Sequence, residues 1–250
     1  MELLKRTEVA HFDTVSEEYR TEYERNTPEG HSFRIRREKV LALLPEGTGK
    51  HALDLASGPG VMIRGLRAKG YRVTCVDASP EMVALAKKEA GDDGEVSCIV
   101  GDAYALPFGA DSFDVATAMG LIEYLDDEER FLAELARVTM QGGTVIITFP
   151  NMWSPWRLWN RALRALARPI RGERKDKLLH REYTPARAKK LLEKRFAVDA
   201  IRYYNVKLVP FPFDRLFPAG VARLSRLSEW LAKTPLGWLG TGFILRAVKH

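Results

Sequence analysis

The stretch Asp54-Leu-Ala-Ser-Gly-Pro-Gly60 decides the fold of this 250-residue chain. It begins within a short apolar run at 51–56 and leads into a helical pattern at 61–69, so a glycine-rich turn joins a strand to a helix. Glycine lets the backbone approach a ligand closely, and the first N–H groups of a helix can donate hydrogen bonds to it. The turn lacks the Gly-x-Gly-x-x-Gly spacing and the Gly-Lys-Ser/Thr of phosphate-binding fingerprints.

Strand-like and helical patterns alternate outward from this turn. Strands are predicted at 71–76, 95–100, 113–119, 144–149, 196–204 and 242–248, and helices from Ser79 and at 126–139, 184–192 and 219–233. Residues 1–45 are predicted to be mostly helical. Because strands that are apolar on both faces alternate with helices, the sequence predicts a parallel sheet covered on both sides, a doubly wound α/β fold.

Three acidic residues stand where the first three strands of this core end. Asp54 lies in the glycine turn, Asp77 ends the second strand 23 residues later, and Asp102 follows the third strand in Gly101-Asp102-Ala103. Open α/β sheets bind ligands in the crevice beyond the carboxyl ends of their strands, and a carboxylate there can accept both hydroxyls of a ribose. The sequence therefore predicts a nucleotide-like binding site at this edge.

Charge is distributed unequally along the chain. Lys and Arg number 39 and Asp and Glu 33, for a net charge of +6; residues 151–250 hold 22 basic and 7 acidic residues, or +15, which leaves 17 and 26, or −9, for 1–150. Two cysteines, Cys75 and Cys98, cannot form a disulfide scaffold, and no Cys/His spacing predicts a metal site. With no secretory signal and no run of 18 apolar residues, a cytoplasmic protein is expected.

The motifs together resemble those of class I S-adenosylmethionine-dependent methyltransferases, in the group that includes ubiquinone and menaquinone biosynthesis enzymes. The turn is similar to that family's Asp-Leu-Gly-Cys-Gly-x-Gly, with Ala56 and Ser57 in place of the first Gly and the Cys. Phe113-Asp-Val and Ala136-Arg-Val-x-x-x-Gly-Gly match its fourth strand and the turn before its fifth. The match is strong at 50–150, looser at 1–45 and 180–204, and nearly absent at 151–180 and 205–235.

The resemblance implies a Rossmann-like, seven-stranded, mostly parallel sheet within a single domain over 1–250. Its expected parts are an N-terminal helical lid at 1–45, a cofactor-binding core at 50–150, a basic amphipathic insert at 151–180, and C-terminal strands at 181–250 with a helical insert at 210–235. S-adenosyl-L-methionine is the implied cofactor.

The resemblance also implies roles for individual residues. Asp54 and the backbone of Ala56, Ser57 and Gly58 would hold the methionine part, Asp77 with Ala78 the ribose, Met82, Asp102 and Ala103 the adenine, and the Met119 carbonyl would face the ammonium group. Arg37, which shares a helix face with Phe33 and Val40, is expected to reach the cofactor carboxylate, although an arginine pointing to solvent fits the pattern equally well. Tyr19 and Tyr23 are expected to close the lid.

Methyl transfer from a sulfonium requires mainly in-line positioning and desolvation, and a general base is needed only for an acceptor that keeps its proton. His180 and Tyr183, which precede a predicted helix, are the first candidates for that base. Glu123 and Tyr124, after the fourth strand, are the next. The alternative for His180 is a structural role in capping the helix that follows it.

The insert at 153–171 combines two helical stripes. Arginines recur at 157, 161, 164, 168 and 171, and apolar residues at Trp156, Trp159, Leu163, Leu166 and Ile170. This pattern fits a lid helix with solvated arginines, a helix lying on an anionic membrane, or a nucleic-acid surface. The last is disfavoured because Ala118-Met-Gly-Leu stands where amino-methylating nucleic-acid enzymes carry Asp/Asn-Pro-Pro-Tyr/Phe.

The sequence thus predicts a methyltransferase for a small, hydrophobic or lipid-like acceptor near a membrane surface, with the insert as either a lid or a peripheral membrane contact. An RNA methyltransferase and a non-catalytic, cofactor-binding partner subunit are the alternatives, the second because the glycine motif departs from the family pattern at Ala56 and Ser57.

Overall fold

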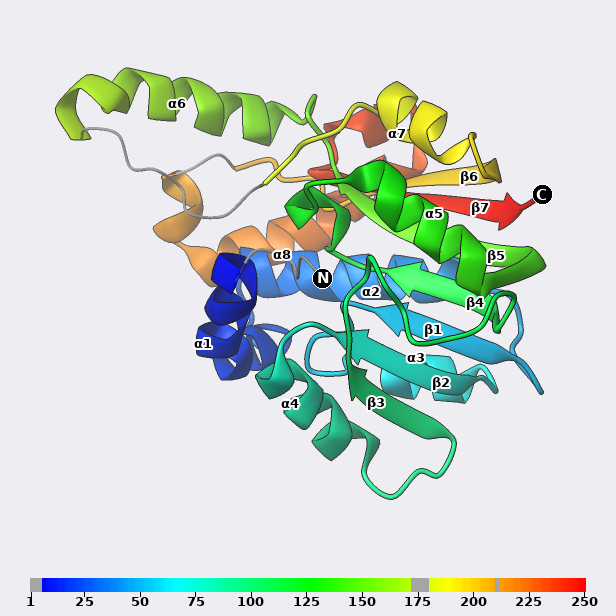
Figure 1. Cartoon of the computed structure of the whole chain (residues 1–250). Coiled ribbons are helices and arrows are strands. Elements are labelled where there is room, and N and C mark those ends of the chain that lie inside the picture. The colour runs from blue at the N-terminus through cyan, green and yellow to red at the C-terminus, as the bar shows by residue number, and fades with distance from the viewer. Residues whose placement is uncertain (1–5, 172–179, 210–211) are drawn as a thin grey trace.

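The computed structural model describes residues 6–171, 180–209 and 212–250, and its centre is one seven-stranded sheet (Figure 1). The strands lie in the order β3-β2-β1-β4-β5-β7-β6. Their bounds are β1 His51–Leu55, β2 Arg72–Asp77, β3 Val96–Val100, β4 Phe113–Ala118, β5 Thr139–Pro150, β6 Phe196–Tyr204 and β7 Gly242–Lys249. Strands β1 to β5 pair in parallel, whereas β7 is antiparallel to both β5 and β6. The predicted doubly wound, mostly parallel sheet is confirmed.

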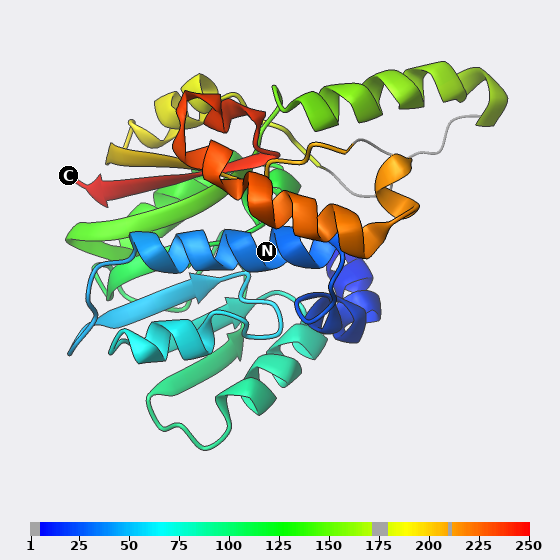
Figure 2. The same ribbon diagram turned by 180° about the vertical axis from the view of Figure 1, so that it is seen from behind.

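Helices cover both faces of this sheet and bury a separate core on each. On one face, α5 (Glu128–Val138) packs over β5, and α7 (Pro185–Leu192) packs over β6 and β7. On the other face, α3 (Ile63–Ala68) packs over β2, α4 (Pro80–Ala90) over β2 and β3, and α2 (Pro28–Leu43) against β6, as seen from behind in Figure 2. Helix α1 (Arg6–Glu22) packs on α4, and α8 (Pro218–Ser228) packs on α2.

Local sequence signals fix where several of these helices begin. The Ser79 side chain accepts a hydrogen bond from the Met82 N–H at the start of α4, and Asp127 and Thr184 cap α5 and α7 in the same way. The buried stripe of α5 consists of Phe131, Leu132, Leu135 and Val138. Because side chains three and four positions apart share a helix face, this spacing directs all four into the core.

The region 1–45, predicted to be mostly helical, contains the two helices α1 and α2, since Thr27 caps α2 and Pro28 occupies its first turn. The start of one strand differs from the sequence prediction. Strand β5 begins at Thr139 instead of 144 and continues through the Gly142-Gly143 pair, where its pairing with β4 shifts register. Gly142 has a φ of +72°, which glycine adopts at no steric cost, so the pair bends the strand without ending it.

The C-terminal part adds irregular elements around the last two strands. Helix α6 (Pro155–Arg171) projects beyond the sheet layers in Figure 1, and 172–179 of the predicted insert lie outside the described residues. The predicted helix at 219–233 is divided into α8 and a 3-10 helix, η3 (Glu229–Lys233), flanked by η2 (Phe213–Arg215) and η4 (Pro235–Leu239). Over the part of the chain that the structure describes, no helix is long and apolar enough to cross a membrane.

Candidate functional site: a pocket at the carboxyl ends of the strands

A pocket lies at the carboxyl ends of β1, β2 and β4, where open α/β sheets bind ligands. Its floor and one wall come from the β1–α3 turn, the β2–α4 turn and the segments after β3 and β4. Of the predicted cofactor-binding residues, those that line it are Tyr19, Ala56, Gly58, Asp77, Ala78, Met82, Ala103 and Met119. The structure therefore brings together residues from five separate segments of the chain.

Asp54 lies directly behind this pocket rather than on its surface. Its carboxylate is buried, Oδ1 accepts a hydrogen bond of 2.6 Å from the Thr117 hydroxyl, and Oδ2 has no hydrogen-bond partner among the described residues. Burial raises the pKa of Asp54 to about 7, against the lowering effect of Thr117. A buried carboxylate with one free oxygen is suited to a ligand that supplies a cationic donor.

Asp77 ties two turns of the pocket together. Its Oδ2 accepts a hydrogen bond of 2.8 Å from the Gly58 N–H and its Oδ1 one of 2.9 Å from the Ser79 N–H. Burial raises its pKa, and these backbone donors oppose that rise. Each carboxylate oxygen retains a second lone pair, so Asp77 can still accept from the hydroxyls of a ligand.

Asp102 is the third acidic residue at a strand end, and like Asp54 it has one carboxylate oxygen without a hydrogen-bond partner among the described residues. Oδ1 accepts a hydrogen bond of 2.9 Å from the Tyr104 N–H, while the buried Oδ2 lacks a partner in the described structure. The neighbouring Gly101 and Ala103 line the pocket. Unpartnered oxygens on both Asp54 and Asp102 fit a ligand with amino groups at its two ends, as S-adenosylmethionine has.

The glycine turn owes its shape to positive φ angles. Ala56 has a φ of +51° and Gly58 one of +52°, and the side-chain oxygen of the buried Ser57 lacks a partner among the described residues. Gly60 has a φ of +81°, and a β-carbon there would stand 3.0 Å from the Ala86 Cα, so glycine is strongly favoured at this position. Ala56, where the family pattern has glycine, therefore occupies a left-handed conformation that costs an L-residue energy.

Helix α1 forms the remaining wall of the pocket. It contributes Glu8, Val9 and Phe12 in addition to Tyr19, and Asp13 accepts a hydrogen bond from the Ser79 hydroxyl at the start of α4. The buried Glu8 carboxylate has an oxygen, Oε2, without a hydrogen-bond partner in the part of the chain described. Sequence reasoning missed Glu8, Val9 and Phe12, because a helix on this edge was predicted without its rotation.

The predicted arginine, Arg37, does not line the pocket. Its guanidinium packs on the Tyr23 ring, 5.7 Å from the ring centroid. The neighbouring Arg36 contacts pocket residues without lining the pocket itself: its Nη2 is 3.3 Å from the Tyr19 hydroxyl, and a β-carbon on Gly120 would stand 2.9 Å from its Nη1. Successive helix positions differ by about 100°, so only one of the two arginines can face the site. Arg36 and Arg37 are both spaced three or four positions from Phe33 and Val40, so the spacing alone did not distinguish them.

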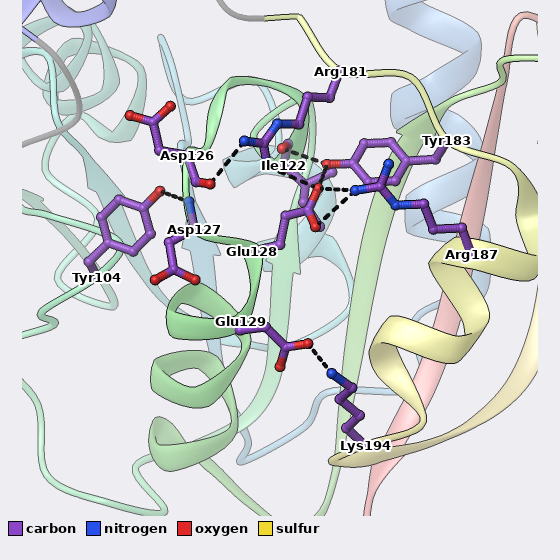
Figure 3. Close-up of polar contacts among 10 residues, drawn as sticks. All are labelled: Tyr104, Ile122, Asp126, Asp127, Glu128, Glu129, Arg181, Tyr183, Arg187 and Lys194. Atoms are coloured by element: carbon purple, nitrogen blue, oxygen red, sulfur yellow. Dashed lines mark hydrogen bonds and ion pairs between the residues drawn. The ribbon is translucent and has the colours of Figure 1, made fainter.

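Tyr183 is not positioned as a base. Its ring is fully buried against Phe149, and its hydroxyl lies 2.7 Å from Glu128 Oε1 and 3.1 Å from the Ile122 carbonyl (Figure 3). The same Glu128 carboxylate pairs with Arg181 and Arg187. Burial and the bond to Glu128 raise the pKa of Tyr183. Tyr183 therefore anchors the segment before α7 to α5, and we no longer consider it a candidate for the general base.

His180 and Glu123 lie on either side of the pocket residue Tyr124. The exposed His180 ring meets the Tyr124 ring edge-on, with centroids 5.7 Å apart. Glu123 is buried, with its Oε2 unpartnered among the described residues, and its backbone carbonyl accepts from the Arg181 N–H. Neither side chain lines the pocket. Tyr124, which follows Glu123 in the chain and contacts the His180 ring, is the pocket residue next to both.

The two stripes of the basic insert are not uniformly exposed. Trp156 turns toward the body, where the Lys207 ammonium lies 4.4 Å from its ring centroid. Arg157 donates to the Thr241 carbonyl at 3.0 Å and pairs with Glu182, which also binds Arg161. The predicted helix is present, and residues far along the chain hold its first turn against the body of the protein.

The described residues contain no group of three or more His, Cys, Asp or Glu side chains placed to hold a metal ion. Cys75 and Cys98 are both buried and free, on neighbouring strands β2 and β3.

Comparison with known proteins identifies the core. Residues 53–147 match the family model described as a methyltransferase domain. The chain is 40% identical over 118 residues to a demethylmenaquinone methyltransferase of Thermus thermophilus, covering 46% of this chain and 54% of that protein. It is 36% identical over 108 residues to ajmaline N-methyltransferase of Rauvolfia serpentina, covering 41% and 37%. The aligned parts thus span about half or less of these relatives.

The fold extends beyond that core. A methyltransferase structure from Thermotoga maritima superimposes with a TM-score of 0.65 at 20% sequence identity, covering 96% of this chain and 98% of that one. This likeness concerns the fold, in which the elements outside 53–147 also have counterparts. Residues 53–147 of this chain thus match a methyltransferase-domain family, and the fold around them is similar to that of an S-adenosylmethionine-dependent methyltransferase structure.

Proposed function

We propose that this chain transfers the methyl group of S-adenosylmethionine to a small, apolar or lipid-like acceptor. The two-sided pocket is the observation that carries this proposal. One side presents the Asp77 carboxylate, and beside it the buried Asp54 and Asp102, which do not line the pocket, each keep an oxygen unpartnered among the described residues. The other side is apolar and aromatic, formed by Val9, Phe12, Tyr19, Leu121 and Tyr124.

The residues that would hold the cofactor follow from these contacts. Asp54 would pair with its ammonium group, Asp77 would accept from the ribose hydroxyls, and Asp102 would accept from the adenine amino group. Arg36, in place of Arg37, would bind the carboxylate. When bound, S-adenosylmethionine supplies an electrophilic methyl group on a positively charged sulfur.

The acceptor side favours a small molecule with apolar surface. Its aromatic residues exclude water from the reacting atoms, which strengthens the electrostatic interactions inside the site. Relatives named for demethylmenaquinone and ajmaline support a small-molecule acceptor. For an acceptor that keeps its proton, Glu123 and His180 are the groups that could receive it, in that order, because the Glu123 carboxylate has an unused oxygen.

Calorimetric titration with S-adenosylmethionine tests the cofactor assignment. Asp77→Ala should weaken binding about a hundredfold, because two hydroxyls of the ribose lose a charged acceptor. Asp92→Ala, at an exposed position after α4, is the matched control and should bind like the native chain. Undiminished binding by Asp77→Ala would remove the ribose assignment.

The acceptor is tested separately. We would incubate the chain and an isotopically labelled methyl donor with lipid extracts or with total RNA, and follow labelled products by mass spectrometry. Label in a small apolar product supports the proposal, whereas label confined to RNA supports the alternative substrate. Binding of the cofactor without S-adenosylhomocysteine formation on any acceptor would indicate a non-catalytic partner subunit.

A further inference from the structure

The face of α8 that points away from the body is unusually apolar. Its inner face, formed by Val221, Ala222, Ser225 and Ser228, is buried, and α8 packs on α2. The opposite face and its flanks carry what we call the outer stripe: Phe213, Leu216, Phe217, Leu224, Leu227 and Trp230. The exposed fractions of Phe217, Leu227 and Trp230 are 74%, 65% and 62%. Aromatic and leucine side chains gathered in this way on a protein surface indicate a binding surface.

The charge around the outer stripe is positive. Arg223, Arg226 and Lys233 are exposed beside it. The two acidic residues at 212–236 are both turned inward: Asp214 is buried, and Glu229 is buried in an ion pair with Lys39. The segment therefore presents cations and apolar side chains to its surroundings while its carboxylates face the protein.

Helix α6 extends the same surface. Beyond its anchored first turn it exposes Trp159 and Leu166, the latter at 74%, while Arg161 pairs with Glu182. Figures 1 and 2 place the far end of α6 and the η2 end of α8 on the side of the molecule toward which β1, β2 and β4 point. The pocket lies at the ends of those same strands.

We propose that the outer stripe, with the projecting part of α6, docks this chain onto an anionic lipid bilayer. Aromatic and leucine side chains enter the interface between headgroups and acyl chains, and basic residues beside them are attracted to anionic headgroups. A nucleic acid would instead be met by a more polar surface. The proposal extends the proposed function, since docking would bring an apolar acceptor close to the pocket.

Sedimentation of the full chain with vesicles tests this proposal, using phosphatidylcholine alone and phosphatidylcholine mixed with phosphatidylserine. The double variant Phe217→Gln/Leu227→Gln should weaken partition about a hundredfold, because each apolar side chain that leaves water contributes about tenfold. The matched double variant Met140→Gln/Ile201→Gln changes exposed apolar residues on β5 and β6, away from the stripe, and should bind like the native chain.

The charge requirement is tested by single substitutions. Arg223→Gln should weaken partition onto the anionic vesicles about fivefold and leave partition onto neutral ones unchanged. Lys190→Gln, which removes one charge from the exposed surface of α7, should have no effect. Absence of sedimentation at low salt would overturn the proposal, and so would equal losses in the stripe variant and its control. Displacement from vesicles by RNA, with RNA binding insensitive to Phe217→Gln/Leu227→Gln, would overturn it in favour of a nucleic-acid surface.

Failure here is distinguishable from failure of the proposed function. Vesicle binding is measured without cofactor or acceptor, and cofactor binding is measured by calorimetry without vesicles. The stripe variant should therefore keep the native affinity for S-adenosylmethionine, whereas Asp77→Ala should keep the native affinity for vesicles.

Discussion

The two halves of this chain use their acidic residues in opposite ways. In the acidic half, 1–150, the buried Asp54 and Asp102 each have one oxygen engaged by the protein and one left without a partner among the described residues. In the basic half, 151–250, the two acidic residues at 212–236, Asp214 and Glu229, are also buried, so the surface of that segment is left to cations and apolar side chains. Buried carboxylates thus keep oxygens available beside the pocket in one region and leave the surface of 212–236 without negative charge in the other.

The largest expected effect is on cofactor binding in the acidic half. Asp54→Asn removes the charge that would pair with an ammonium group, so the affinity for S-adenosylmethionine should fall about a hundredfold at pH 8. Calorimetry measures this loss, and vesicle binding should stay at its native level. Native affinity in the variant would show that Asp54 serves only the fold.

The same variant should change how stability depends on pH. The pKa of about 7 for folded Asp54 lies above the unfolded value of about 3.9, so its contribution to stability is fully present below about pH 4 and is lost as the pH rises through 7. Without ligand, Asp54→Asn should therefore be more stable than the native chain at pH 8, with little difference at pH 4. Native cofactor binding should also strengthen as the pH rises through 7, with release of a proton, and thermal unfolding and calorimetry across pH check both trends.

A second substitution sharpens the assignment within the N-terminal helices. Arg36→Gln should weaken cofactor binding about tenfold, since a hydrogen bond between charged groups is lost. Arg37→Gln is the matched control because Arg37 packs on Tyr23 outside the pocket, and it should bind the cofactor like the native chain. The reverse result would restore the arginine that the sequence first indicated.

A substitution of Tyr183 distinguishes a role in stability from a role in catalysis. Tyr183→Phe removes the hydroxyl that bonds Glu128, and we expect a loss of about 1.5 kcal/mol in the free energy of unfolding. Turnover should be unchanged once the protein is folded, because the hydroxyl points to α5. Denaturant titration gives the first quantity and a methylation assay the second; a loss of turnover without a loss of stability would return Tyr183 to the list of bases.

The smallest effect concerns the glycine turn. Ala56→Gly relieves the left-handed conformation at a φ of +51° but adds freedom to the unfolded chain, so a net gain of about 0.5 kcal/mol in stability is expected. Gly58, which already has glycine's freedom at +52°, should respond to Gly58→Ala with a loss of stability. Thermal unfolding of both variants measures the contrast, and a destabilised Ala56→Gly would show that the turn is not strained.

The cofactor edge could be predicted from sequence because it depends on local signals. Apolar runs mark the strands, and whatever follows them in a parallel sheet meets at one edge, which placed Asp77 and Ala103 in the pocket. Helix caps such as Ser79 are equally local. Periodicity also placed an arginine of α2 near the site, but it did not fix the rotation of the helix that favours Arg36 over Arg37.

What could not be predicted depends on contacts between distant residues. Tyr183 has the sequence context of an active-site residue, and only Glu128, 55 positions earlier, reveals its structural role. Trp156 fits an exposed stripe until Lys207 packs over its ring. The outer stripe of α8 has the same helical period as a core-facing helix, so its exposure becomes evident only when the buried face is known.

The position of β7 has a consequence for how the chain folds as it is made. This strand, Gly242–Lys249, lies between β5 and β6, and β6 joins the sheet only through it. During synthesis, β1 to β5 can assemble early, while β5 keeps an open edge and β6 waits without a partner until residues 242–249 leave the ribosome. Open strand edges invite pairing with other chains. Truncation before Gly242 should therefore yield an aggregating product, even though every strand at the cofactor edge is present.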